Sequence, residues 1–153
     1  MYEGGRIMQK QKGFTLIELL IVVAILIILV AVTYPKIAQA IESTKEAATK
    51  ANVAVIKEAI AFYYGDNAGV YPATLTDEAF KKYLPIMPQV KVTHLGKPNA
   101  LKGTSSDVLV VKTDSPIADN TDGWRYNATT GNVWVNNSQT DTKGMSYSMY
   151  GYK

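Results

Sequence analysis

The sequence contains no cysteine and only one histidine, His94. Without cysteine no disulfide can staple the fold, so packing, hydrogen bonds or a bound ion must hold it together. A single histidine with no thiol removes most nucleophile–base pairs and most zinc sites, and no glycine-rich phosphate loop is present. We expect His94 to be an ordinary surface or strand residue. These absences argue against an enzyme.

Charge of one sign is also scarce. The 16 basic and 13 acidic residues give a formal net charge of +3, and the basic residues are dispersed along the chain. A surface that binds nucleic acid needs basic residues gathered on one face. We therefore expect no nucleic-acid partner.

What the sequence has in excess is one long apolar run near its start. Leu19 to Val32 is apolar without a break, and no charged residue occurs from Leu19 to Tyr34. As a single helix, Phe14 to Tyr34 would be about 30 Å long, about the thickness of a bilayer's hydrocarbon core. A soluble domain rarely holds a helix that is apolar all round. The run therefore predicts a membrane-spanning helix.

Basic residues ahead of the run predict its orientation. By the positive-inside tendency, the N-terminal end stays in the cytoplasm and everything after Lys36 lies outside. The basic residues in question are Arg6, Lys10 and Lys12.

Three interpretations of this segment are possible: a secretory signal peptide, a plain signal anchor, and a membrane helix in which Glu18 has a function. Glu18 is the one carboxylate in the apolar helix, and the three interpretations explain it differently. A secretory signal peptide would be cleaved near Ala38-Gln39-Ala40, where small residues follow the run. A plain signal anchor would remain attached to the chain. Neither gains anything from a carboxylate that costs energy in an apolar setting. An ionisable residue inside a membrane instead predicts a function and a partner.

The stretch Lys12 to Ile25, KGFTLIELLIVVAI, resembles the class III signal of type IV pilins and type II secretion pseudopilins. The shared features are a basic leader, a glycine, a phenylalanine, a glutamate at a fixed offset and an apolar helix. The resemblance implies that a prepilin peptidase cuts between Gly13 and Phe14 on the cytoplasmic side. It also implies that the new Phe14 amine is N-methylated.

The same resemblance implies how subunits assemble. Glu18 would pair with the Phe14 ammonium of a neighbouring subunit and so set the register of a filament. Two opposite charges lower each other's cost in a low-dielectric setting, and methylation leaves the amine positive. Thr15 matches a common pilin residue that helps to position the terminus.

The function implied is a structural subunit of a type IV pilus-like filament, polymerised from the inner membrane through its N-terminal helix. The alternatives are a major pseudopilin of a type II secretion system, or a minor pilin acting as a membrane-anchored binding module. An exported enzyme is a remote third class. Expected partners are further copies of the chain, prepilin peptidase, membrane lipid, and an inner-membrane assembly platform with its motor ATPase. The precursor is expected in the inner membrane, and the product in an extracellular or periplasmic filament.

One departure from the family concerns the middle of this helix. Many pilins have a glycine there, and their helix can melt between that glycine and a proline when it packs in a filament. Here no glycine occurs between Phe14 and Pro35. We expect Pro35 to bend the helix, because it lacks a backbone donor, and we expect melting to be harder.

The chain as a whole is predicted to be α+β, in three parts. Residues 1–13 form a leader (with Met8 as an alternative start), residues 14–35 the transmembrane and assembly helix, and residues 36–153 an extracytoplasmic globular domain. Phe14 to about Tyr64 is predicted to be one kinked helix, ended by Gly65-Asp66-Asn67. Its second half should pack on the domain through apolar residues at helical spacing: Ile37, Ile41, Ala48, Ala51, Val55, Ala59 and Phe62.

A small antiparallel sheet is expected on that second half of the helix. Trp124 to Asn127 and Asn132 to Asn136 should form an antiparallel hairpin that at least partly buries Trp124 and Trp134. The tyrosine-rich tail from Gly144 should add an edge strand or lie against the sheet. Further expected elements are a short helix through residues 79–83, capped by Thr74 or Thr76, and strands within residues 90–95 and 107–113.

An oxygen-rich stretch offers the one candidate metal site, because calcium takes about six to eight oxygen ligands from such loops. The residues are Asp119, Asn120 and Asp122, flanked by Asp114 and, later, Asp141. Their spacing matches no family pattern, so we favour a solvated turn and no cofactor, with calcium as the alternative. The sequons at Asn127 and Asn136 are expected to be unused.

Overall fold

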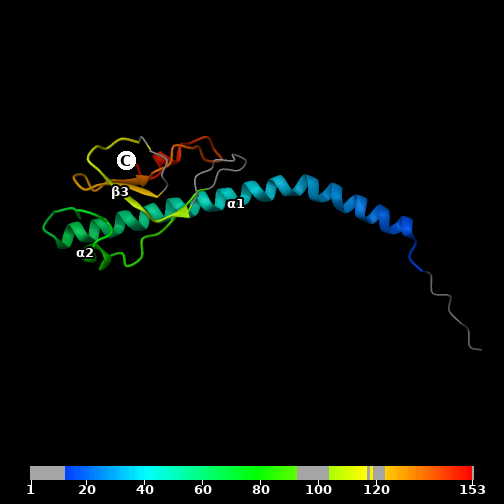
Figure 1. Ribbon diagram of the computed structural model, residues 1–153, viewed down its shortest axis with the longest axis horizontal. Coiled ribbons are helices and arrows are strands. Elements are labelled where there is room, and N and C mark those ends of the chain that lie inside the picture. Colours follow the sequence, from blue (N-terminus) through cyan, green and yellow to red (C-terminus); the bar gives the residue numbers. More distant parts are fainter. Residues whose placement is uncertain (1–12, 93–103, 117, 119–122, 153) are drawn as a thin grey trace, which may run out of the picture. The chain divides into compact units, whose positions relative to one another are not determined.

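The structure of the protein is a computed structural model that describes residues 13–92, 104–116, 118 and 123–152. Its first element is α1, Leu16–Asp66, a helix of 51 residues (Figure 1). The prediction of a single helix over this part of the chain is confirmed. Residues up to Ile37 and residues from Ala38 onward form two separate compact units.

Helix α1 continues without a break through Pro35. A proline in a helix lacks the N–H that would bond to the carbonyl four residues earlier. Nearby, the Thr33 hydroxyl donates to the Leu29 carbonyl at 2.7 Å, a bond that often accompanies bending. The segment is thus helical throughout, whereas the expected bend at Pro35 stays a prediction.

The end of α1 lies where the sequence predicts it. Ala68 and Gly69 turn the backbone into the left-handed region, with φ of 53° and 81°. The Gly69 N–H donates to the Tyr64 carbonyl at 3.0 Å, and the Asn67 side chain donates to the Tyr63 carbonyl at 2.8 Å. These bonds satisfy carbonyls that the last helical turn leaves without partners.

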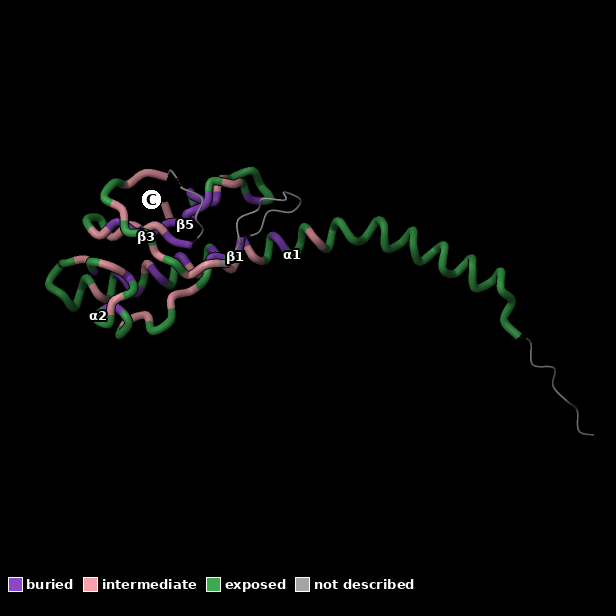
Figure 2. Tube along the Cα trace, in the orientation of Figure 1, coloured by how far each residue is buried: buried purple, intermediate pink, exposed green. Residues whose placement is uncertain are grey.

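The buried face of α1 is not the one predicted from its apolar residues. Ile41, Val55 and Phe62 are 52%, 46% and 61% exposed, and of the predicted set only Ala59 is fully buried. The covered face instead carries Glu42, Glu46, Thr49, Val53, Ile56, Ala59 and Ile60 (Figure 2). Counting apolar residues gave the wrong face, because several positions on the covered face are polar and form hydrogen bonds with distant parts of the chain.

Two small sheets follow α1. In the first, β1 (Val90–Lys91) pairs antiparallel with β2 (Thr104–Ser105). In the second, the order is β3 (Val108–Val111), β4 (Trp124–Asn127), β5 (Val133–Val135). The predicted hairpin is confirmed: β4 and β5 pair antiparallel, with Trp124 opposite Val135.

The fold class is α+β as predicted, but the larger sheet is mixed and not wholly antiparallel. β3 and β4 run parallel, with Val108 opposite Trp124. Two parallel neighbouring strands must be joined by a connection that returns the chain to the end of the sheet at which the first strand began. The segment between Val111 and Trp124 is long enough for such a connection. β3 and β4, although consecutive in the sequence, therefore need not form an antiparallel hairpin.

The core lies between the sheet and the covered face of α1. Trp124, Tyr126 and Val133 are fully buried in one cluster with Ile56 and Ile60. Burying a side chain of this size typically contributes about 1.5–3 kcal/mol. The polar atoms of the two aromatics are also satisfied: the Trp124 indole donates to the Pro88 carbonyl, and the Tyr126 hydroxyl to the Pro72 carbonyl, both at 2.7 Å. These bonds fasten the segment that links α1 to the strands.

That linking segment contains α2, Glu78–Lys81. Its cap is Asp77, whose carboxylate accepts from the Phe80 N–H at 2.8 Å, and not Thr74 or Thr76 as predicted. The two threonines share a hydrogen bond of 3.0 Å with each other instead. An aspartate is among the strongest N-cap residues, and Asp77 lies three residues before Phe80, the spacing at which an N-cap side chain reaches a free N–H of the first helical turn.

The tail lies against the sheet, which is the second of the two predicted arrangements. It forms the short 3₁₀ helix η1, Tyr147–Met149. The Val135 N–H donates to the Tyr150 carbonyl at 3.1 Å. Trp134, on the opposite face of β5 from Val133 and Val135, packs edge-on against Tyr152 with ring centres 5.7 Å apart. Both tryptophans are completely buried, as predicted.

Candidate functional site

The start of α1 is closed by a capping box. Thr15 precedes the first helical residue, and its hydroxyl accepts from the Glu18 N–H at 3.3 Å. In return, Glu18 Oε2 accepts from the Thr15 N–H at 2.9 Å and from the Thr15 hydroxyl at 2.8 Å. A threonine followed three residues later by a glutamate forms this reciprocal arrangement at many helix starts. The Thr-x-x-Glu spacing that indicates this box is visible in the sequence.

The capping box fixes one oxygen of Glu18 and not the other. Among the described residues, Oε1 of Glu18 accepts no hydrogen bond, while Oε2 accepts two. An ionised carboxylate has about four acceptor positions, and in an apolar setting each unused position leaves the charge less stabilised. The geometry therefore supplies a carboxylate that is held in place by its own chain and has capacity for a further donor.

Gly13 and Phe14 both lie before the helix. A Cβ added at Gly13 would meet nothing within 4 Å, so no contact in this subunit requires a glycine there. Phe14 is 77% exposed. The choice of these two residue types is therefore not explained by the fold of the single chain.

The first part of α1 presents apolar side chains on every side. All residues from Leu16 to Tyr34 are exposed, and the best 18-residue window has a mean hydropathy of 3.2 (Figure 2). By length and composition the helix can cross a membrane. So large an apolar surface is stable only against lipid or against other apolar helices.

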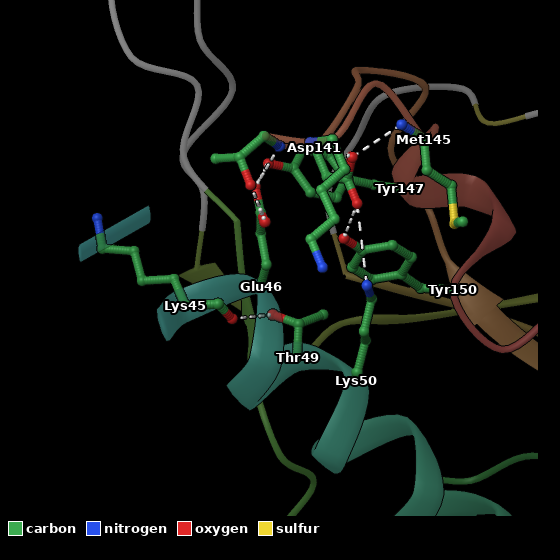
Figure 3. A network of polar contacts seen from close by, with 10 residues as sticks. Lys45, Glu46, Thr49, Lys50, Asp141, Met145, Tyr147 and Tyr150 are labelled. Atoms are coloured by element: carbon green, nitrogen blue, oxygen red, sulfur yellow. Dashed lines mark hydrogen bonds and ion pairs between the residues drawn. The ribbon is translucent and has the colours of Figure 1, made fainter. Parts of the chain in front are cut away.

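A second polar site, which the sequence analysis did not predict, is centred on Glu46. This buried carboxylate accepts from the Thr142 N–H and the Thr142 hydroxyl, both at 2.7 Å, and from the Tyr147 hydroxyl at 3.1 Å (Figure 3). Unlike Glu18, it therefore has both oxygens occupied by its own chain. The contact joins residues 96 and 101 positions apart, which no local pattern can reveal.

Asp141 forms the other half of this network. Burial alone would raise the pKa of its carboxyl, but hydrogen bonds from the Tyr150 hydroxyl and the Met145 and Lys143 N–H groups, with the nearby Lys50 ammonium, lower it below its usual range. The Tyr150 bond is 2.6 Å, and Lys50 Nζ lies 3.9 Å from the carboxylate (Figure 3). Burial and the same carboxylates raise the pKa of Tyr147 and of Tyr150. The loop before η1 is thus fastened to α1 by charge-assisted hydrogen bonds.

The calcium candidates Asp119, Asn120 and Asp122 lie outside the described residues, as does His94. The flanking Asp114 accepts from the side chains of Asn127 and Asn132 at 2.7 and 2.6 Å. Within residues 13–92, 104–116, 118 and 123–152, no group of three or more acidic, histidine or cysteine side chains could hold a metal.

Both sequon asparagines are buried. Asn127 is 2% exposed and Asn136 is not exposed at all. The Asn127 amide nitrogen already donates to Asp114. A glycan could not be attached to either side chain without displacing it from the folded domain.

Comparison with protein families gives a match at the N-terminal end of the chain. The profile of the prokaryotic N-terminal methylation motif matches residues 8–34, which include the capping box and the exposed apolar part of α1. No solved structure matches the chain. The motif is the signal by which prepilin peptidase processes its substrates, and the proteins that carry it are structural and assemble into pilus-like filaments. Residues 8–34 therefore carry the prepilin-type signal that marks type IV pilins and pseudopilins, and the helix within this signal is long and apolar enough to cross a membrane.

Proposed function

We propose that this protein is the structural subunit of a type IV pilus-like filament and that it polymerises with further copies of itself from the inner membrane. The observation that carries the proposal is the hydrogen bonding of the Glu18 carboxylate. Its carboxylate is held by the capping box, and Oε1 has capacity for one more donor. In the apolar surroundings that α1 requires, the donor must be another polar group of the assembly.

The donor that fits is the Phe14 amine of an adjacent subunit. Cleavage between Gly13 and Phe14 by prepilin peptidase would create this amine, and methylation would leave it positive. An unpaired buried ammonium costs several kcal/mol, so each arriving subunit would be held where its amine meets a carboxylate. Cleavage leaves the Thr15 amide in place, so the capping box remains available in the mature chain.

The remaining parts of the proposal concern location and energy supply. The basic leader favours a cytoplasmic N-terminus, with the globular domain outside the membrane. A membrane assembly platform and its cytoplasmic motor ATPase would supply the work of extracting the helix from lipid. Lipid contacts the exposed apolar part of α1 until filament neighbours replace it.

The N-terminal motif supports a second role equally well, that of the major pseudopilin of a type II secretion system. A minor pilin that serves as a membrane-anchored binding module is the third. A deletion strain separates these roles. Loss of surface filaments with normal protein export supports the pilus, whereas loss of export with no surface filament in the wild type supports the pseudopilin.

The proposal is tested by Glu18→Ala, with Glu58→Ala as the matched control, because Glu58 is an exposed glutamate of the same helix. We expect Glu18→Ala to be cleaved normally and to insert in the membrane, since a costly charge has been removed. It should form no filaments by itself, as judged by electron microscopy of sheared fractions and immunoblots of the membrane pool. Wild-type filament numbers from Glu18→Ala alone would overturn the pairing role.

A further inference from the structure

The globular domain contains a hollow that has no part in the proposed pairing of Glu18 with Phe14. It has a volume of about 280 Å³ and lies between the last turns of α1 and the turn that joins β4 to β5. Its walls are formed from α1 by Lys57, Ile60, Ala61 and Tyr64, and from the rest of the domain by Tyr71, Thr130, Gly131 and Asn132. The hollow is therefore assembled from three separate segments of one compact unit.

The aromatic wall of the hollow is held rigidly. The rings of Tyr64 and Tyr71 lie 4.5 Å apart at an angle of 33°. A Cβ on Gly131 would lie 2.2 Å from the Tyr71 ring, so the ring can occupy its place only because this residue is glycine. Gly131 also has φ of 73°, a conformation that suits glycine.

The opposite wall is fixed by Asp114. Its carboxylate accepts from the Thr130 hydroxyl at 3.0 Å and from the Asn132 amide at 2.6 Å. These bonds hold the turn in one conformation. The wall is thus preorganised, which reduces the entropy that a ligand would lose on binding.

Three polar groups at the hollow have no hydrogen-bond or ion-pair partner among the described residues: the Lys57 ammonium and the hydroxyls of Tyr64 and Tyr71. The ammonium can bind an anion, and each phenol hydroxyl can donate to or accept from a ligand hydroxyl. The flat rings add a surface on which a ring with C–H groups on one face can stack. The hollow thus offers one positive charge, two hydroxyls and an aromatic surface. A complementary ligand has one negative charge, several hydroxyls and a partly apolar face.

We propose that this hollow binds an acidic sugar, with its carboxylate on Lys57, its hydroxyls on Tyr64 and Tyr71, and its ring against the tyrosine pair. The volume suits one sugar ring and lies near the lower limit for small-molecule sites. Such a site recognises a uronate unit, either free or at the end of a polysaccharide. This binding is separate from the structural role in the filament proposed above.

The test uses the ¹⁵N-labelled full-length protein in detergent micelles, titrated with glucuronate, glucose and benzoate. We expect glucuronate to shift the amide resonances of Gly131 and Asn132 with saturation, and glucose to bind about tenfold more weakly, because it lacks the charge-assisted hydrogen bond. Lys57→Met should bring the affinity for glucuronate down to that for glucose. Lys143→Met, which changes an exposed lysine elsewhere in the domain, should leave it unchanged.

A second variant keeps the test independent of folding. Tyr71→Phe retains the ring and removes only its hydroxyl, so the domain should keep its melting temperature while binding both sugars more weakly. The proposal is overturned if glucuronate gives no saturable shift, if glucose binds as tightly, or if Lys57→Met binds glucuronate normally. Tighter binding of benzoate than of glucuronate would also overturn it, because the site would then select an aromatic acid.

Discussion

Glu18 and Glu46 are two carboxylates of the same helix, and they satisfy their hydrogen-bonding capacity in different ways. Glu46 accepts three hydrogen bonds from Thr142 and Tyr147 of its own chain, and both of its oxygens are used. Glu18 has one oxygen in the capping box and one without a partner among the described residues. The difference separates a carboxylate that completes a fold from one that is prepared for a partner outside it.

The surroundings of the two glutamates differ in the same sense. Around Glu46 the helix is covered by the sheet and tail, and the isolated subunit satisfies its own polar groups. Around Glu18 every neighbouring side chain is exposed, from Leu16 at 83% to Val22 at 46%. One half of α1 thus belongs to a finished domain, whereas the other half is stable only in lipid or among other helices.

The largest effect is expected from removing the partner that Glu18 awaits. Gly13→Val should prevent cleavage, since a branched side chain does not fit where the peptidase accepts glycine. Without cleavage Phe14 has no amine and no filaments form. Immunoblots should show only precursor in the membrane. The space around Gly13 is empty, so the folding of the domain is not affected.

Gly65→Ala serves as the control for that experiment, because a Cβ there also meets nothing within 4 Å. It should be processed and assembled normally. Mature protein of normal size from Gly13→Val would show that the peptidase does not require a small residue at this position.

The next effect is on stability and concerns Glu46. Glu46→Ala leaves the buried Tyr147 hydroxyl and the Thr142 N–H without their acceptor, which should lower the free energy of unfolding by about 3 kcal/mol. The measurement is urea unfolding of residues 36–153, which we expect to be soluble and folded, with tryptophan emission typical of buried indole. Glu58→Ala should change the unfolding free energy by less than about 0.5 kcal/mol. Equal stability of the two variants would contradict the structural role of Glu46.

The pH dependence of the same fragment separates Asp141 from the tyrosines. The pKa of Asp141 is lowered, so its contribution to stability is present above the unfolded value of about 3.9 and is lost as the pH falls below it. The pKa values of Tyr147 and Tyr150 are raised, so their contribution is lost as the pH rises above about 10. Unfolding midpoints should therefore fall at both extremes.

Tyr150→Phe identifies the alkaline part of this profile. The variant loses the 2.6 Å bond to Asp141 and should be less stable at neutral pH, but its stability should decline less steeply above pH of about 10. An alkaline decline of unchanged steepness would mean that other tyrosines, such as the buried Tyr126, cause it.

The smallest effect is expected from Thr15. Thr15→Val removes the hydroxyl but keeps the backbone N–H that also donates to Glu18 Oε2. A helix cap of this kind typically contributes about 1 kcal/mol, so filament numbers should fall partially and not vanish. Thr15→Ser retains the cap and should assemble like the wild type. Complete loss of filaments in Thr15→Val would mean that the hydroxyl does more than hold Glu18.

Much of the fold follows from local sequence. The length of α1, its end at Asp66 and the β4–β5 hairpin depend on residues that are close in sequence. The covered face of α1 does not, because Thr142 and Tyr147 lie about a hundred positions from Glu46. Two glutamates on a helix indicate a solvated face unless their distant partners are known. The parallel pairing of β3 with β4 was not predicted either, because the sequence of a strand does not show in which direction its neighbour runs.

The functional residues can likewise be divided into those that local sequence identifies and those that only the folded structure brings together. Gly13, Phe14 and Glu18 were identified from their resemblance to a known signal, and their roles in cleavage and assembly stay predictions. The capping box could have been found from the Thr-x-x-Glu spacing alone. The hollow beside Tyr71 could not, because it requires Gly131 and Lys57, which belong to different elements.

The most direct test of the central claim is a cryo-electron microscopy reconstruction of the filament at a resolution that shows side chains. We predict that Oε1 of each Glu18 lies within hydrogen-bond distance of the Phe14 amine of an adjacent subunit, while Oε2 keeps its bonds to Thr15. A filament in which the Phe14 amine of every subunit contacts only its own Glu18, or no carboxylate at all, would contradict the account.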